Sequence, residues 1–176
     1  MAGQRRRWGW HQLAPEVARQ LVADAHLPKR SLVLDIGAGG GAITQPLVDA
    51  GHRVIAVEAH RGRADELRDR FDSGVTVVRA DAADLRLPRR PFHVVANPPY
   101  GIVAPLLRRL LSRGSQLRSA HLVVDARAVK VWTSHRAPGV GRWAAEFDVR
   151  GGPPVRRSAF RPPPHVDSRI LVIRRR

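Results

Sequence analysis

The sequence contains no cysteine, few aromatic residues and no long apolar run. Without cysteine, the chain cannot form disulfides, thiolate zinc sites or thiol nucleophiles. Its eight histidines are scattered, with no pair at the spacing of helical metal ligands, so we expect no metal site. No apolar stretch approaches the roughly 20 residues of a membrane span. No signal-type apolar segment follows the basic residues 5–7. We therefore expect a cytoplasmic protein that does not bind membranes.

Positive charge is what the sequence has in excess, with a formal net charge of +16 in 176 residues. Such an imbalance indicates a polyanionic partner, with nucleic acid as the first candidate. Nearly all of the basic residues are arginine, whose planar guanidinium suits bidentate phosphate contacts. The length fits a single hydrophobic core. We predict a basic N-terminal arm over residues 1–12 and one domain over residues 13–176, acting as a monomer.

Short apolar runs alternate with segments of helical character, a pattern typical of a doubly wound α/β fold with a parallel sheet. Because a proline inside a helix is costly, the helix that contains Pro46 is expected to start late, with Thr44 as its cap. After residue 136 the pattern changes, and two further strands are predicted to form an antiparallel hairpin at the sheet edge. The predicted helices cover 13–27, 61–71 and 105–111; the predicted strands cover 31–36, 53–58, 75–80, 92–96, 119–125, 142–149 and 168–176.

A glycine-rich turn, DIGAGGGAIT at 35–44, follows the first of these strands. Gly37 and Gly39 let a ligand approach the backbone closely, and Glu58 at the end of the next strand can accept the hydroxyls of a ribose. This pattern fits a nicotinamide dinucleotide as well as S-adenosylmethionine. Asp81, with the Ala82 backbone beside it, is placed to bind an adenine amino group. The sequence therefore predicts a nucleotide-type cofactor, with two classes still open.

The tetrapeptide NPPY at 97–100 ends the fourth strand, since proline cannot continue a sheet ladder. The side-chain oxygen of Asn97 and the carbonyl of Pro98 can each accept one N–H of an exocyclic amine. That pair of bonds directs the nitrogen lone pair at a sulfonium methyl, while Tyr100 stacks on the extruded base. Positioning and electrostatics then supply most of the catalysis. Methyl transfer from S-adenosylmethionine is therefore favoured over hydride transfer.

These motifs, with FRPPPHVDS at 160–168, resemble the family of ribosomal RNA adenine N6-methyltransferases over nearly the whole chain. The resemblance implies a Rossmann-like class I S-adenosylmethionine-dependent methyltransferase fold, mostly parallel with an antiparallel edge hairpin, and a ribosomal RNA substrate. It also implies that Phe160 stacks on the far face of the target adenine from Tyr100. The residues that it places around the cofactor are Gly37, Glu58, Asp81 and Asn97.

The chain departs from that family in two places. The arm has WHQL at 10–13 where relatives carry Gln-Asn-Phe or Gln-His-Phe, and His11 and Leu13 fall at the positions that contact the methionine end of the cofactor. Family members also continue into a small helical domain, so this sequence resembles a short form that lacks it. Other arginines would then hold the RNA. The candidates are Arg5–Arg7, Arg108, Arg109, Arg113, Arg156, Arg157, Arg161 and Arg174–Arg176.

Within the family, the turn DIGAG after the first strand, the motif NPPY and the short length favour the macrolide-resistance type. That type methylates the N6 amine of an adenine in 23S rRNA. Two alternatives stay open, a housekeeping 16S rRNA adenine dimethyltransferase and a non-catalytic RNA-binding homologue, the latter supported by the altered WHQL arm. A protein or small-molecule methyltransferase is disfavoured because a neutral substrate does not require such a strong positive field.

Overall fold

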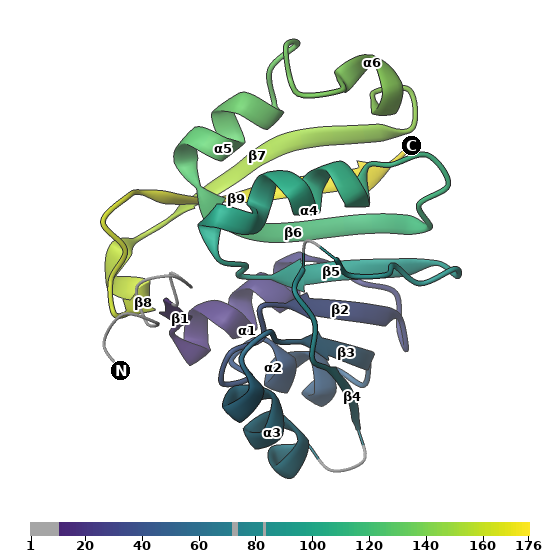
Figure 1. The fold of residues 1–176 in the computed structure, drawn as a ribbon. Coiled ribbons are helices and arrows are strands. Elements are labelled where there is room, and N and C mark those ends of the chain that lie inside the picture. Colours follow the sequence, from purple (N-terminus) through teal and green to yellow (C-terminus); the bar gives the residue numbers. More distant parts are fainter. Residues whose placement is uncertain (1–10, 72–73, 83) are drawn as a thin grey trace.

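A computed structural model describes residues 11–71, 74–82 and 84–176. Its main feature is a seven-stranded sheet in which five neighbouring strands are parallel and only β9 runs in the opposite direction (Figure 1). In sheet order the strands are β4 (Val75–Val78), β3 (Arg53–Val57), β2 (Leu32–Ile36), β5 (Phe92–Ala96), β6 (Leu117–Asp125), β9 (Ser168–Arg175) and β7 (Phe147–Val155). This is the predicted parallel sheet with an antiparallel edge.

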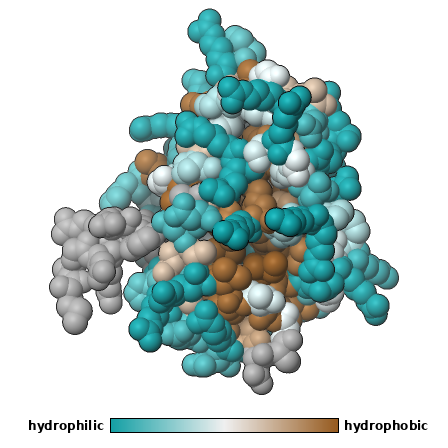
Figure 2. Space-filling view, turned by 45° about the vertical axis from the view of Figure 1, so that its right-hand side comes forward, coloured by the Kyte–Doolittle hydropathy of each residue, from teal (hydrophilic) through white to brown (hydrophobic). Residues whose placement is uncertain are grey.

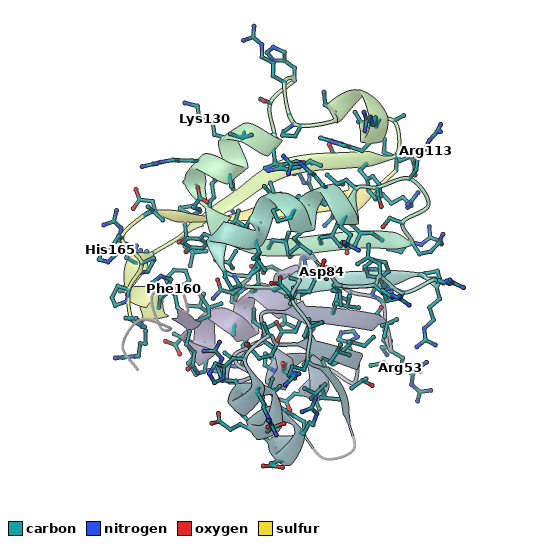
Figure 3. All side chains as sticks on the ribbon, viewed as in Figure 1. Arg53, Asp84, Arg113, Lys130, Phe160 and His165 are labelled. Atoms are coloured by element: carbon teal, nitrogen blue, oxygen red, sulfur yellow. The ribbon has the colours of Figure 1, made fainter. Side chains whose placement is uncertain are left out.

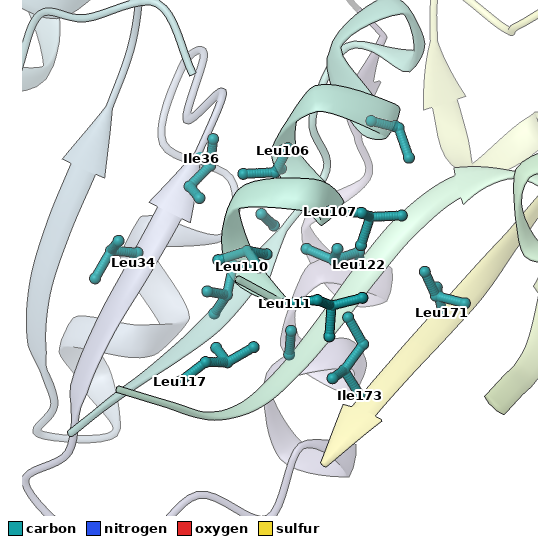
Figure 4. Packing of buried hydrophobic residues seen from close by; sticks show 14 of the residues in the cluster. Leu34, Ile36, Leu106, Leu107, Leu110, Leu111, Leu117, Leu122, Leu171 and Ile173 are labelled. Carbon is teal, nitrogen blue, oxygen red and sulfur yellow. The ribbon is translucent and has the colours of Figure 1, made fainter. Parts of the chain in front are cut away.

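Helices cover both faces of the sheet (Figure 1). One face carries α1 (Pro15–Asp24), α2 (Thr44–Asp49) and α3 (Arg61–Arg70). The other carries α4 (Val103–Leu110), α5 (Ala126–Trp132) and α6 (Val140–Trp143). Alternate residues of β2 point to opposite faces, so Leu34 and Ile36 pack against the leucines of α4 (Figure 4) while Val33 packs toward α1. Burial on both faces explains why the central strands β2 and β5 are mostly apolar.

The segment between β4 and β5 contains no helix among its described residues. That part of the sheet is covered by a loop that buries Leu85 and leaves Ile55, Val78 and Leu87 partly buried. Figure 2 shows an apolar area between hydrophilic side chains on the surface. Among the described residues, no helix is both long and apolar enough to cross a membrane.

Two local predictions were wrong. The predicted strand 142–149 begins instead with the helix α6, and β7 starts only at Phe147, because Trp143 is buried and its indole N–H donates to the Pro138 carbonyl at 3.0 Å. The helix with Pro46 does start at Thr44, but Thr44 is not its cap. Its hydroxyl donates instead to Asp35 Oδ2 at 2.7 Å, because both side chains are buried and the carboxylate needs a donor.

A second, two-stranded sheet joins the start of the described chain to the segment between β7 and β9. In it, β1 (Gln12–Leu13) pairs antiparallel with β8 (Phe160–Arg161), which follows the short helix η3 (Arg157–Ala159). The Ala14 N–H also donates to the Ala159 carbonyl at 2.8 Å. The expected arm of residues 1–12 lies mostly outside the described residues, and its last residue belongs to this pairing. Residues 12 and 13 are therefore held beside the loop that precedes β9.

Candidate functional site

A cavity opens at the carboxyl ends of β2, β3 and β5, the edge at which open α/β sheets bind ligands. Nine of the predicted site residues line it: His11, Leu13, Gly37, Glu58, Asp81, Ala82, Asn97, Pro98 and Tyr100. Gly39 and Phe160 are not among the described lining residues. The lining also includes residues not assigned to the site from the sequence, among them Gln12, Asp35, Ile43, Arg63 and Ile102. Each of these lies within five positions of a predicted site residue, and that proximity was the only signal in the sequence.

The glycine turn and the NPPY segment are in direct contact. Gly37 has a φ of +77°, and a Cβ atom there would lie 2.9 Å from Pro99 Cδ and 3.3 Å from Pro98 Cα. Only glycine fits both the backbone conformation and this approach. The predicted cofactor turn and the predicted methyl-acceptor segment therefore meet at one point of the cavity.

Glu58 is buried, with 4% of its surface exposed, and it is already hydrogen-bonded. Its Oε1 accepts from the His60 N–H at 2.8 Å and from Arg63 Nη2 at 3.1 Å, while Oε2 accepts from the Gly39 N–H at 2.9 Å. The Gly39 N–H thus hydrogen-bonds the Glu58 carboxylate, and Gly39 itself does not line the cavity. Since each carboxylate oxygen has two lone pairs, Oε2 keeps one acceptor position. Glu58 can accept one ribose hydroxyl in this arrangement, and a second requires Arg63 to leave Oε1.

The cavity lining is acidic although the chain is basic. Among the described residues that line it are Asp35, Glu58 and Asp81, with one arginine, Arg63. Burial raises the pKa of Asp35 to about 7, against the opposing effect of the hydrogen bonds from Thr44, and the charge of Glu58 raises it further. This set of groups fits a cationic ligand such as a sulfonium. Within the described ranges, no group of three or more potential ligands is placed to hold a metal ion.

Asn97 is held so that its amide presents an acceptor. Its Nδ2 donates to the His11 backbone carbonyl at 2.7 Å. Because a carbonyl oxygen can only accept, this partner identifies the NH₂ end of the amide. Among the described residues, no donor contacts Oδ1. The atom predicted to bind the substrate amine is therefore the one left without a protein partner.

The two predicted aromatic walls lie in different environments. Tyr100 is half-buried in the cavity, where its hydroxyl hydrogen-bonds Ser168 Oγ at 2.6 Å and burial raises its pKa, an effect that the Ser168 bond opposes. Phe160 is only 1% exposed and packs in the core cluster with Leu13, its partner in the β1–β8 ladder. Phe160 is not among the described residues that line the cavity, and its stacking on the far face of a base from Tyr100 stays a prediction. The pairing of β8 with β1 turns the ring into the interior.

The arginines predicted to bind RNA fall into two groups. Arg175 is tied to the protein, since its guanidinium donates to Glu146 and to the Leu117 carbonyl, each at 2.9 Å, and lies over the Phe147 ring. Arg109 donates to the Leu85 carbonyl. Figure 3 shows His165 and Lys130 on the same side as Phe160, and Arg113 at the other end of the sheet. Arg5–Arg7 lie outside the described residues. The exposed candidates are Arg108, Arg113, Arg156, Arg157, Arg161, Arg174 and Arg176.

Comparison with known proteins matches residues 4–176 to the family model "Ribosomal RNA adenine dimethylase". An rRNA adenine N-6-methyltransferase of Corynebacterium diphtheriae is 36% identical over 81% of this chain and 57% of its own length. A ribosomal RNA small subunit methyltransferase A of Thermosynechococcus vestitus is 35% identical over 97% of this chain and 69% of its own. Among solved structures, the 23S rRNA methyltransferase ErmE superposes with a TM-score of 0.81 at 28% identity, covering 92% of this chain and 68% of that one.

The chain spans little more than half the length of some of these curated relatives. The family match, in contrast, extends over almost all of the chain, and the similar structures are methyltransferases with the same Rossmann-like fold. The chain therefore belongs to the ribosomal RNA adenine dimethylase family, whose cofactor is S-adenosylmethionine.

Proposed function

We propose that this chain transfers a methyl group to the N6 amine of an adenine in ribosomal RNA, with 23S rRNA as the favoured substrate and macrolide-type antibiotic resistance as the outcome. The observation that carries the proposal is the orientation of Asn97. Its Nδ2 is occupied by the His11 carbonyl, so its Oδ1 is presented as an acceptor beside the glycine turn. A donor N–H of an adenine amine fits that acceptor.

S-adenosylmethionine, when bound, supplies the methyl group from its sulfonium. Gly37, Glu58, Asp81 and Ala82 would hold its nucleoside part, and His11 and Leu13 lie where the resemblance places its methionine end. The acidic lining offsets the positive charge of the sulfonium.

The protein's contribution to the reaction is to position and polarise the amine. Asn97 Oδ1 and the Pro98 carbonyl accept its two N–H groups, which draws the nitrogen out of conjugation with the ring and frees its lone pair for the methyl carbon. Tyr100, fixed through Ser168, provides a face for the base. A base must leave its stack to reach this cavity. Positioning of this kind accounts for rate without a strong general base.

The charge supports RNA as the substrate. A net charge of +16 favours a polyanion over a protein or a small neutral molecule. The exposed Arg161 belongs to β8, and the exposed Arg156 precedes η3, close to β1 and its cavity-lining residues. An rRNA substrate would place the protein in the cytoplasm. We expect residues 13–176 to act as the catalytic domain, as a monomer, with residues 1–12 as an RNA-contacting arm.

A 16S rRNA adenine is the second candidate. The small-subunit relative is 35% identical over 97% of this chain, which is nearly the same similarity as that of the Corynebacterium protein over a longer stretch. The DIGAG turn and NPPY favour the large subunit, but no residue of the sequence reveals which RNA loop is read.

The test is methyl transfer from labelled S-adenosylmethionine to separated 16S and 23S rRNAs, followed by mapping of the modified base. Label on a 23S adenine supports the favoured substrate, and label on a 16S adenine assigns the housekeeping reaction. The Asn97→Ala protein, assayed in parallel, controls for contaminating methyltransferases. Saturable binding of S-adenosylmethionine without label on either RNA would contradict both rRNA reactions, and absence of cofactor binding would indicate a non-catalytic homologue.

A further inference from the structure

The antiparallel half of the sheet carries basic side chains on the face that also carries α1. Val172 of β9 packs in the same core cluster as α1, which places its side chain on that face. His121 of β6 and Arg150 of β7 are its direct partners in the two ladders, so their side chains point the same way. Arg174 lies two positions further along β9 and therefore shares the face. Three neighbouring strands thus bring together one histidine and two arginines.

The two arginines are close enough to act on one ligand. Arg150 lies opposite the residue two positions before Arg174, so the two are diagonal neighbours on adjacent strands. Such positions are about 7–8 Å apart, which long side chains can bridge. Each guanidinium presents a planar fork of N–H donors that matches the oxygens of a phosphate. Arg150 and Arg174, here called the arginine pair, can therefore donate to the same phosphate group.

Neither member of the arginine pair is used by the fold. Both side chains are exposed, and among the described residues neither takes part in a hydrogen bond or an ion pair. Asp148 is the direct ladder partner of Arg174, but the two side chains form no salt bridge. The next residue, Arg175, is in contrast held by Glu146 and two carbonyls. The arginine pair is available to a ligand, whereas Arg175 is not.

The buried His121 lies within the field of the arginine pair. Its side chain is 4% exposed, and its Nδ1 has no hydrogen-bond partner among the described residues. The charges of Arg174, Arg150 and His26 act on it in one direction, and the charge of Asp24 acts in the other. At neutral pH, two guanidiniums and one carboxylate leave an excess of positive charge around this ring. An anion bound by the arginine pair would offset that excess.

We propose that the arginine pair binds one phosphodiester group of the substrate RNA on the α1 face of the sheet. Arg174 is level with Ser119, which precedes the carboxyl end of β6 at Asp125 by six residues, or about 20 Å of strand. A phosphate held there belongs to a part of the RNA well away from the target nucleotide. The arginine pair therefore supplies affinity and orientation without touching the reacting amine. This inference rests on the proposed function, because it takes RNA as the substrate.

Four variants test the site against a matched control. Arg150→Ala and Arg174→Ala, singly and together, remove the donors, and Asp148→Asn removes the neighbouring negative charge. The control is Arg53→Ala, which removes the same charge from an exposed residue at the start of β3 (Figure 3). Filter binding to separated 16S and 23S rRNAs at several salt concentrations gives Kd and its salt dependence. Methyl transfer gives kcat and KM, and thermal melting verifies that each variant is folded.

We expect each single arginine variant to weaken RNA binding about five-fold, because each removes a charged donor to a phosphate. The double variant should lower the slope of log K against log salt by about 0.7–0.9, the value for one phosphate. Since both arginines serve that phosphate, the double loss should be smaller than the product of the single losses. KM for RNA should rise with kcat unchanged. Asp148→Asn should tighten binding, and Arg53→Ala should leave it near the wild-type value.

Three results would overturn the inference. Arginine variants that match Arg53→Ala in Kd and salt slope would show that the arginine pair is only solvated surface. Fully multiplicative losses, with a slope change of two phosphates, would contradict a shared phosphate. A fall in kcat at unchanged KM would place the effect at the cavity. A wild-type protein that binds RNA through the arginine pair but labels neither rRNA contradicts the proposed function and not this site, so the two failures are distinguishable.

Discussion

The two ends of the sheet differ in the sign of the charged side chains that lie there. At the carboxyl ends of β2, β3 and β5, the cavity is lined by three acids and one arginine. At the opposite end, Arg175 is held by carbonyls and by Glu146. Between the two ends, in the middle of β6, the buried His121 lies in the field of Arg150 and Arg174. The net positive charge of +16 is therefore not concentrated in the cavity, whose acidic lining suits a cationic cofactor. Substitutions at the first end should alter turnover, and those at the second end should alter stability.

The largest expected effect is at the catalytic end. Asn97→Ala removes the acceptor that Nδ2 and the His11 carbonyl hold in place, and we expect kcat to fall by roughly 100-fold or more, as when other preorganised hydrogen-bonding groups are removed. The cofactor Kd should change much less, since the amide acts on the amine. Equal losses in kcat and in cofactor affinity would mean that Asn97 only binds. Thermal melting provides the control, because the side chain is only partly buried.

In the middle of the sheet, His121 should make the fold sensitive to acid. It is 4% exposed, its Nδ1 has no hydrogen-bond partner among the described residues, and burial lowers its pKa to about 4. The charges of Arg174, Arg150 and His26 contribute to this lowering of the pKa, and the charge of Asp24 opposes it. Because the folded-state pKa is below the unfolded value of 6.5, stability is retained above pH 6.5 and lost as the pH falls toward 4. The loss amounts to roughly 3 kcal/mol.

Urea unfolding at pH 7 and at pH 4.5 measures this loss. The His121→Asn protein, which cannot take up a proton there, should lose less stability over the same interval than the wild type. An identical pH dependence in both proteins would show that His121 does not control the acid transition.

The third prediction compares neighbouring arginines of the C-terminal strand. Arg175→Ala should cost about 1–3 kcal/mol of folding free energy, because Glu146 and two carbonyls would lose a charged donor. Arg174→Ala, at an exposed position, should leave stability nearly unchanged but reduce the salt dependence of RNA binding if Arg174 contacts phosphate. Chemical denaturation and filter binding at several salt concentrations measure the two effects. Equal stability of both variants would remove the distinction between structural and RNA-facing arginines.

The parallel half of the sheet could be predicted because its signals are local. Short apolar runs followed by turns mark β2, β3 and β5 directly in the sequence. The antiparallel half could not be predicted as well, because β7 continues through Gly151–Pro154 with an irregular register at the sheet edge, where proline is tolerated. The four-residue helix α6 was also missed, since so short a segment shows no periodicity.

The site shows the same division between local and distant information. Gly37, Glu58, Asp81 and Asn97 end strands and could be identified from their positions. The contact of His11 with Asn97 and the pairing that buries Phe160 join residues far apart in the chain. A motif shows which residue types occur in the sequence. The neighbours that an aromatic side chain contacts are determined by the tertiary structure.

The smallest expected effect is the release of a proton from Asp35 when the cofactor binds. Burial raises the pKa of Asp35 to about 7 in the folded protein, so the stability tied to its protonated form is present below pH 3.8 and lost as the pH rises through 7. This trend opposes that of His121. A cationic cofactor beside Asp35 should lower its pKa and release part of one proton per site near pH 7. Calorimetric titration of S-adenosylmethionine in buffers of different ionisation enthalpy measures that release, and Asp35→Asn, which keeps an acceptor for Thr44, should abolish it. Proton release that persists in Asp35→Asn would assign the linkage to another group and would leave Asp35 as a structural partner of Thr44.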